Sequence, residues 1–190
     1  GKKLARRIPG KLVLFGTTDE VVSLLALRHD ALSERFVLTL PAGPAVHTLL
    51  DKRRFHQAID RLGFGGPETF CPTSLDEARQ ASRQVPLPCI IKPVHSTAFC
   101  REFQTKVFRA ESPDEVLAGY LRAVQAGHEV IIQETVLGPD TNLTGCVGRD
   151  GRLLGAFAFR RIRQQPRGFG NGTLVVGERQ DQLMDLAARL

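Results

Sequence analysis

Lys92 is one of three candidates for chemistry in this 190-residue chain, by its residue type and its place at a strand end. It ends the apolar run 88–93, a pattern typical of a short buried strand, and a proline follows it. A lysine at a strand end can simply reach solvent, and this interpretation stays open. The same position also lets an ammonium act as a point charge on phosphate oxygens.

A second candidate is the segment 133–140, where a strand breaks into a turn at Gly138 and Pro139. Such a break brings together exposed backbone groups and apolar cover, which is what a planar heterocycle needs. Asp140 follows the turn and could accept hydrogen bonds from ribose hydroxyls. An ordinary linker between domains is the alternative interpretation.

Two arginines form the third candidate. On a predicted strand over 153–163, Arg161 and Arg163 are two residues apart and point to one face, while Arg160 points to the other. Three glycines follow within a few residues, at Gly168, Gly170 and Gly172. Together they favour an anion site that suits a transferring phosphoryl group or a carboxylate. A solvated basic edge strand is the alternative.

The first 50 residues predict a small βαβ unit with strands at 11–15 and 35–40. The helix between the strands begins after a polar start signal at 17–20. Gly16 stands alone, so the dinucleotide-binding glycine fingerprint is missing.

The middle of the chain predicts a small α+β layer of mostly antiparallel strands covered by two helices. Asp51 caps a helix that ends at Leu62, and Ser74 and Ser112 each begin a capping box. Residues 94–105 show no period and predict a loop. Three of the strands are expected at 88–93, 106–110 and 129–134.

The pattern changes after a hinge at 136–139. Strands at 142–147 and 153–163 are joined by a tight hairpin, and a loop over 164–172 leads to a strand at 173–176. A last helix starts at Asp181.

Composition places the chain among globular proteins, with 42% hydrophobic and 24% charged residues. The basic N-terminus has no apolar core behind it, and no run reaches the roughly 20 residues that span a bilayer, so a cytoplasmic protein is expected. The net charge of +6 comes with no basic helical stripe, which argues against nucleic acid. The four cysteines lack metal-ligand spacing and predict reduced thiols packed in a core: Cys71, Cys89, Cys100 and Cys146.

The order of these signals resembles the ATP-grasp superfamily, and within it the carboxylate–amine ligase-like proteins. A helix start at 50–52 is followed about 40 residues later by the lysine-ended strand 90–93. The strand 131–134 comes another 40 residues on, and 138–140 follows it. The resemblance implies an α/β fold of α+β layers, with a nucleotide cleft between two layers and a small βαβ unit in front. It implies three parts: a pre-ATP-grasp region at 1–50, a first layer at 51–136 and the start of a second layer at 137–190.

The resemblance also implies roles for single residues. Lys52 and Lys92 would approach the ATP phosphates, and Asp140 would bind the ribose. Arg161 and Arg163 would act in catalysis on the transferred phosphoryl group or the acyl phosphate. The adenine would be held by backbone groups between Glu134 and Val136, near the side chain of Gln133.

The implied chemistry is attack of a substrate carboxylate on the γ-phosphate of ATP, followed by displacement of phosphate from the acyl phosphate by an amine or a thiol. The expected partners are thus a small carboxylic acid and an amine, and a homo-oligomer is compatible with them. A non-catalytic nucleotide-binding or scaffolding module of the same fold is the alternative.

Two departures from the family pattern stand out. The segment after Lys92 contains no glycine, so the Ser96 and Thr97 hydroxyls would replace a glycine-rich phosphate loop. The acidic and asparagine residues that bind Mg²⁺ on late strands of the second layer have no counterpart, so no residue here is assigned to the metal. The chain alone is therefore expected to be truncated and catalytically incomplete, with the Mg²⁺ ligands downstream.

Overall fold

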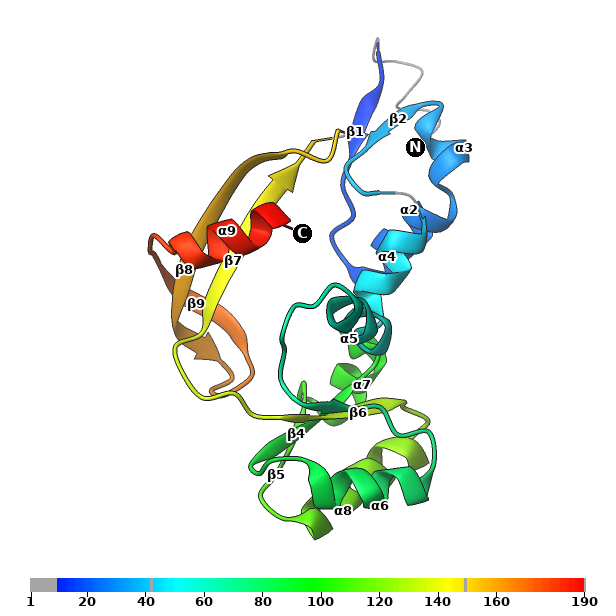
Figure 1. The fold of residues 1–190 in the computed structure, drawn as a ribbon. Helices are drawn as coiled ribbons and strands as arrows, with labels where there is room; N and C mark the ends of the chain where they lie inside the picture. Colours follow the sequence, from blue (N-terminus) through cyan, green and yellow to red (C-terminus); the bar gives the residue numbers. More distant parts are fainter. Residues whose placement is uncertain (1–9, 42, 149, 190) are drawn as a thin grey trace. The chain divides into compact units, whose positions relative to one another are not determined.

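The computed structural model describes residues 10–41, 43–148 and 150–189 (Figure 1). Contacts divide the chain into two compact units, Gly1–Thr135 and Val136–Leu190. The three-part division after residues 50 and 136 stays a prediction. Within the described ranges, no helix has the length and apolar character needed to cross a bilayer.

The first unit begins with the predicted βαβ arrangement. Strands β1 (Leu12–Leu14) and β2 (Phe36–Leu38) pair in parallel, and helices α2 (Asp19–Leu27) and α3 (His29–Ser33) connect them. The hydroxyl of Thr18 accepts a hydrogen bond from Val21 N at 3.4 Å and caps α2. The polar start signal in the sequence therefore marks the true beginning of this helix.

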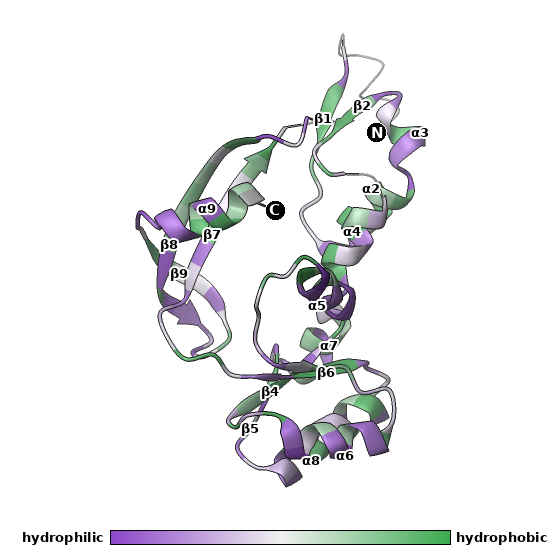
Figure 2. Ribbon diagram, viewed as in Figure 1, coloured by the Kyte–Doolittle hydropathy of each residue, from purple (hydrophilic) through white to green (hydrophobic). Residues whose placement is uncertain are grey.

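Two helices connect the βαβ part to the four-stranded main sheet of the same unit. Helix α4 (Gly43–Leu50) was not predicted, and a proline in its first turn is compatible with a helix start. Helix α5 (Lys52–Arg61) begins at the predicted Asp51 cap. Figure 2 shows α5 as strongly hydrophilic.

The main sheet has four antiparallel strands in the order β3 (Thr69–Phe70), β6 (Val130–Glu134), β4 (Cys89–Pro93) and β5 (Phe108–Ala110). Helices α6 (Leu75–Gln84) and α8 (Pro113–Gln125) pack on each other and on one face of the sheet (Figure 1). Both helices begin at the predicted serine caps. The α+β layer expected from the sequence is thus confirmed.

The predicted loop at 94–105 is wrong, because residues Ser96–Phe103 form helix α7. Phe99 on this helix is fully buried, with its ring centroid 4.7 Å from that of Phe103 and 5.0 Å from that of Phe108. His95 precedes the helix and makes no side-chain cap. Tertiary packing of two phenyl rings one turn apart therefore holds a helix that local signals do not announce.

The second unit is a three-stranded antiparallel sheet followed by a helix. Its strands are β7 (Thr141–Val147), β8 (Leu153–Gln165) and β9 (Asn171–Gly177), in that order, and helix α9 (Asp181–Arg189) contacts β8 and β7. Strand β8 runs two residues past its predicted end, so the loop before β9 is shorter than the predicted 164–172.

The prediction that all four thiols are packed in a core is wrong. All four are free, but only Cys89 is buried, in the core beneath β4. Cys146 is exposed on β7, because the sheet of the second unit leaves much of its apolar surface accessible.

Candidate functional site

Strand alternation places Lys92 on the face of the main sheet that lies away from the helices. Cys89 and Ile91 are fully buried in the core that β4 shares with α6 and α8. Ile90 and Lys92 alternate with them and point to the other face. There the Lys92 ammonium is half-buried and donates to Gln133 Oε1 on β6 at 2.7 Å.

Lys52 reaches the same part of the molecule from the first turn of α5. Its ammonium donates to Ser96 Oγ at 2.7 Å and to the backbone oxygen of Val94 at 3.4 Å. Both acceptors lie within three residues of the end of β4, the strand that contains Lys92. The structure therefore brings together four residues that the sequence nominated separately: Lys52, Lys92, Ser96 and Gln133.

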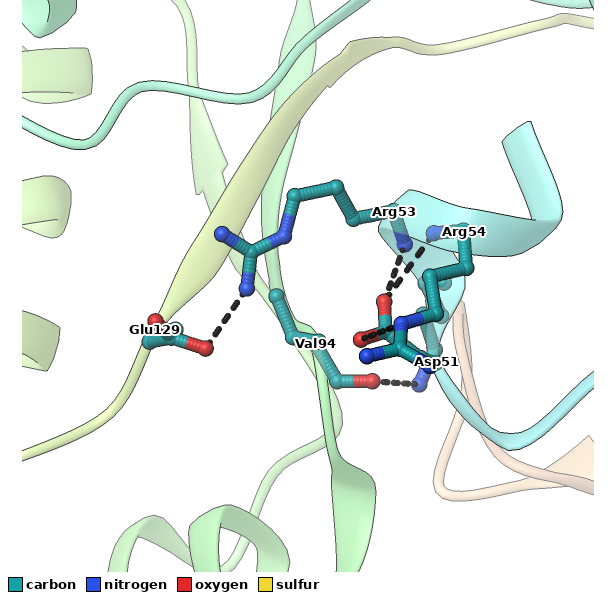
Figure 3. Close-up of polar contacts among 6 residues, drawn as sticks. Asp51, Arg53, Arg54, Val94 and Glu129 are labelled. Atoms are coloured by element: carbon teal, nitrogen blue, oxygen red, sulfur yellow. Dashed lines mark hydrogen bonds and ion pairs between the residues drawn. The ribbon is translucent and has the colours of Figure 1, made fainter. Parts of the chain in front are cut away.

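The first turn of α5 is fastened to the sheet by polar contacts (Figure 3). Asp51 Oδ1 accepts from the backbone nitrogens of Arg53 and Arg54 at 2.9 and 3.0 Å. Arg53 Nη2 donates to Glu129 Oε2 at 2.6 Å. Val94 N donates to Glu129 O at 2.9 Å, and Val94 O accepts from Lys52 N at 3.5 Å. These contacts fix the position of the backbone at Lys52, from which its side chain extends.

The two lysines influence each other electrostatically. Burial, and then the positive charge of Lys52, lowers the pKa of Lys92 to about 8. Burial also lowers the pKa of Lys52, although the negative charges of Asp19 and Asp51 act in the opposite direction. Two half-buried ammonium groups that repel each other are an unfavourable arrangement, which a bound anion would relieve.

Both ammonium groups have neutral hydrogen-bond partners. Across the described ranges, no carboxylate lies within salt-bridge distance of Lys52 or Lys92. Neither ammonium therefore has a direct ion-pair partner, although Asp19 and Asp51 act on Lys52 from further away. A polyanion such as a phosphate chain fits this arrangement, since it would supply the missing charge.

A cavity of about 400 Å³ opens on the Ser96 side of the pair. Three helices line it with two carboxylates, two imidazoles and a guanidinium. The titratable lining residues are Asp19, Glu20, His47, His95 and Arg101. Hydrogen bonds from its own backbone nitrogen and from the hydroxyls of Thr18 and Thr97 lower the pKa of Glu20. The cavity thus offers both signs of charge to a small polar ligand.

The segment predicted to hold a heterocycle has part of its backbone already engaged. Glu134 N donates to Glu68 O at 3.0 Å, and Thr135 N donates to Pro88 O at 3.1 Å. Val136 follows in the second unit and is 70% exposed. A ligand at this segment would have to use the remaining backbone groups.

In the second unit, Asp140 and Arg161 contact each other. Arg161 Nη1 donates to Asp140 Oδ2 at 2.6 Å, and Asn142 Nδ2 donates to Asp140 Oδ1 at 3.0 Å. Gly172 lies against this arginine, because a Cβ there would come within 3.0 Å of Arg161 Nε. That nitrogen is buried and has no hydrogen-bond partner.

The other two arginines of the cluster have different surroundings. Arg160 Nε donates to Glu178 Oε2 at 3.1 Å, whereas Arg163 is exposed. The pairing of β8 with β9 is irregular between Arg161 and Gln164. Arg160 and Arg161 therefore pair with different carboxylates, those of Glu178 and Asp140. That Arg161 and Arg163 share a face stays a prediction.

Sequence reasoning missed two features of the site. Thr69 accepts from Gln133 Nε2 at 2.6 Å, and Arg53 pairs with Glu129. Neither contact has a sequence signal, because each joins residues more than 60 positions apart. Among the described residues, no three His, Cys, Asp or Glu side chains converge on a metal geometry.

No protein-family model matches the chain. Among curated proteins, the carbamoyl phosphate synthase large chain of Vibrio vulnificus is 37% identical over 49 residues, which are 26% of this chain and 4% of that protein. This match is too short to assign a family.

Solved structures match over most of the chain. The L-amino acid ligase of Bacillus licheniformis matches 99% of it with a TM-score of 0.66 and 12% identity. The ATP-bound carboxyaminoimidazole ribonucleotide synthase of Aspergillus clavatus matches 86% with a TM-score of 0.62 and 14% identity. The MgADP-bound biotin carboxylase domain of the Hydrogenobacter thermophilus 2-oxoglutarate carboxylase matches 86%, with a TM-score of 0.63 and 15% identity.

These matches confirm the resemblance at the level of the fold, which is that of the ATP-grasp ligases. The chain spans 43%, 40% and 37% of the three matched chains, respectively, and so less than half of each. The sequence identities are too low to transfer a substrate.

Proposed function

We propose that this chain forms the ATP-binding part of an ATP-dependent ligase that joins a carboxylate to an amine or a thiol. The observation that carries the proposal is the pair of half-buried ammonium groups of Lys52 and Lys92, which share one end of β4 and have neutral partners. The fold, which is that of ATP-grasp ligases, supports it.

The phosphate chain of ATP would take the place between the two ammonium groups. Phosphate oxygens accept strong charge-assisted hydrogen bonds, and three of the six N–H donors of the two ammonium groups are not used in the hydrogen bonds described above. Binding would also supply negative charge that offsets burial and the repulsion from Lys52, which together lower the pKa of Lys92. The chemistry of the donors therefore fits an oligophosphate better than a neutral ligand.

The reaction would begin with attack of a substrate carboxylate on the γ-phosphate of ATP, which releases ADP and forms an acyl phosphate. An amine or thiol would then attack the acyl carbon and release phosphate. The cavity beside Ser96 is the proposed place for the carboxylic acid, because it adjoins Lys52 and contains Arg101. These residues would position the reactants and neutralise charge.

The remaining nominated residues complete the proposal. Free backbone groups between Glu134 and Val136 would hold the adenine, and Asp140 would accept from ribose hydroxyls. Arg161 and Arg163 would stabilise the transferred phosphoryl group. The described residues offer no cluster for Mg²⁺, so no step is assigned to it.

Isothermal titration calorimetry with ATP, with and without Mg²⁺, tests the proposal. Lys92→Met keeps the aliphatic stem and removes the charge, so it should weaken ATP binding by about tenfold or more. Lys106→Met is the matched control, since Lys106 is an exposed lysine outside the pair and should leave affinity unchanged. A folded wild-type protein that shows no heat with millimolar ATP would refute the proposal, and so would equal losses in the two variants.

A further inference from the structure

Three hydrogen bonds run in series from Lys92 to the edge strand β3. Lys92 Nζ donates to Gln133 Oε1 at 2.7 Å, and Gln133 Nε2 donates to Thr69 Oγ1 at 2.6 Å. Thr69 Oγ1 in turn donates to the backbone oxygen of Pro67 at 2.8 Å. The side chains of Lys92, Gln133 and Thr69 are all half-buried.

The strand register explains why these side chains meet. Thr69 lies directly opposite Gln133, and Gln133 lies directly opposite Ile90. Lys92 is two residues beyond Ile90 and so shares its face. A long side chain reaches such a diagonal neighbour, and the three polar groups form one row across the sheet.

Each bond in the row can run in only one direction. An ammonium only donates, so the group of Gln133 that faces Lys92 must be its oxygen. The carbonyl of Pro67 only accepts, so the hydroxyl hydrogen of Thr69 is committed to it. The hydroxyl oxygen is then left to accept, and it takes the NH₂ group of Gln133.

We propose that Thr69 is a positioning residue for Lys92. Its hydroxyl holds the Gln133 amide with the oxygen toward the ammonium, and it thereby keeps a neutral acceptor beside Lys92 Nζ. The proposal rests on the proposed role of Lys92 as a phosphate ligand.

Loss of the Thr69 hydroxyl would release the amide. Gln133 could then turn its NH₂ group toward Lys92, so that a donor would face a donor. The ammonium would have no acceptor in a half-buried place beside the charge of Lys52, and its charged form would be disfavoured. The position and the charge of Lys92 would both change, although Lys92 itself is untouched.

The test is a pH titration of the Lys92 side chain by NMR on protein labelled at lysine, without nucleotide. Loss of one signal in Lys92→Met identifies the resonance. The variants are Thr69→Val, which removes the hydroxyl at nearly constant size, Thr69→Ala, which removes it and shortens the side chain, and Thr69→Ser, which keeps a hydroxyl. Thr105→Val is the control, since the Thr105 hydroxyl donates to Val107 O at 3.0 Å and has no part in the row.

Both hydroxyl-free variants should move the titration midpoint of Lys92 down by about one pH unit. Thr69→Ser and Thr105→Val should titrate like the wild type. ATP affinity should fall several-fold in the hydroxyl-free variants alone. An unchanged midpoint in the hydroxyl-free variants overturns the positioning role, and so does a shift that Thr69→Ser fails to rescue. A shifted midpoint in a protein that binds no ATP overturns the proposed function and leaves the hydrogen-bond row standing.

Discussion

Arg161 donates from Nη1 to Oδ2 of Asp140 at 2.6 Å, and a second hydrogen bond, from Arg161 N to Asp140 O at 2.8 Å, joins the same two residues through their backbones. The residue predicted to bind ribose and a residue predicted to bind the phosphoryl group are therefore one ion pair. While this ion pair is formed, Arg161 Nη1 and Asp140 Oδ2 are engaged with each other, so each side chain has fewer hydrogen-bonding groups left for a ligand.

Asp140→Ala should free the Arg161 guanidinium for anions. The pair is partly exposed, with 24% and 44% of the two side chains accessible, so its own contribution to stability is about 1 kcal/mol or less. Affinity for inorganic triphosphate should rise about threefold, while the preference for ATP over triphosphate should fall because a ribose ligand is gone. Calorimetry with the two ligands measures both effects.

Asp181→Ala is the matched control, since Asp181 pairs at the same distance, 2.6 Å, with the exposed Arg179 in the same unit. It should change neither affinity. If Asp140→Ala also changed neither, Asp140 and Arg161 would be a structural pair without a ligand.

Folding stability should depend on pH through Lys92. Its pKa in the folded protein is about 8, below the unfolded value of about 10.4, so the unfolded chain binds more protons between these two values. The free energy of unfolding should therefore rise with pH across this window. Below pH 8, where Lys92 is charged in both states, its charge should destabilise the folded protein to the full extent. Lys92→Met removes the penalty and should raise the melting temperature at pH 7.

The gain from Lys92→Met should shrink as the pH rises from 8 toward 10. Thermal melts at several pH values measure it, with Lys106→Met melted in parallel for comparison. A gain that stays constant with pH would mean that the substitution acts through packing and not through charge.

Arg163 should matter for turnover in a ligase that contains this chain. Loss of a preorganised charged donor costs on the order of 10²-fold in rate, so Arg163→Ala should lower kcat by that factor and change ATP affinity little. Arg160→Ala should leave kcat unchanged, because Arg160 pairs with Glu178. Steady-state kinetics with both variants decide it, and a damaging Arg160→Ala beside a silent Arg163→Ala would reverse the assignment.

Phe99→Ala should destabilise the first unit strongly. The ring is fully buried and contacts Phe103 and Phe108, so its loss should cost about 3–5 kcal/mol. Phe15→Ala should cost far less, because Phe15 is 66% exposed. Urea unfolding compares the two, and similar costs would show that α7 is not held by Phe99.

The sequence predicted helices correctly where a capping residue marks the first turn. Thr18, Asp51, Ser74 and Ser112 all cap helices as expected, because their hydroxyls or carboxylates satisfy backbone donors within a few residues. Helix α7 has no side-chain cap of this kind and was missed, and α4 was missed as well. Helix α7 is stabilised by packing against residues outside it, as Phe99 packs against Phe108.

For the candidate site, too, local patterns were readable from the sequence and contacts between distant residues were not. Lys92 and Gln133 were nominated from strand ends, and the strand pairing then joined them by a hydrogen bond. Thr69 was not nominated, because a lone threonine carries no functional signal until the strand register places it opposite Gln133. Pairings between strands are long-range facts that a single sequence does not display.

Helix α7 also bears on how fast a ligand can bind. A flexible loop beside Lys92 would lose its conformational entropy when a ligand orders it, and closing would add a step to association. Residues Ser96–Phe103 lose that entropy at folding, since Phe99 anchors them in the core. The wall beside the two lysines is thus preorganised, and ligand capture there needs no ordering of this segment.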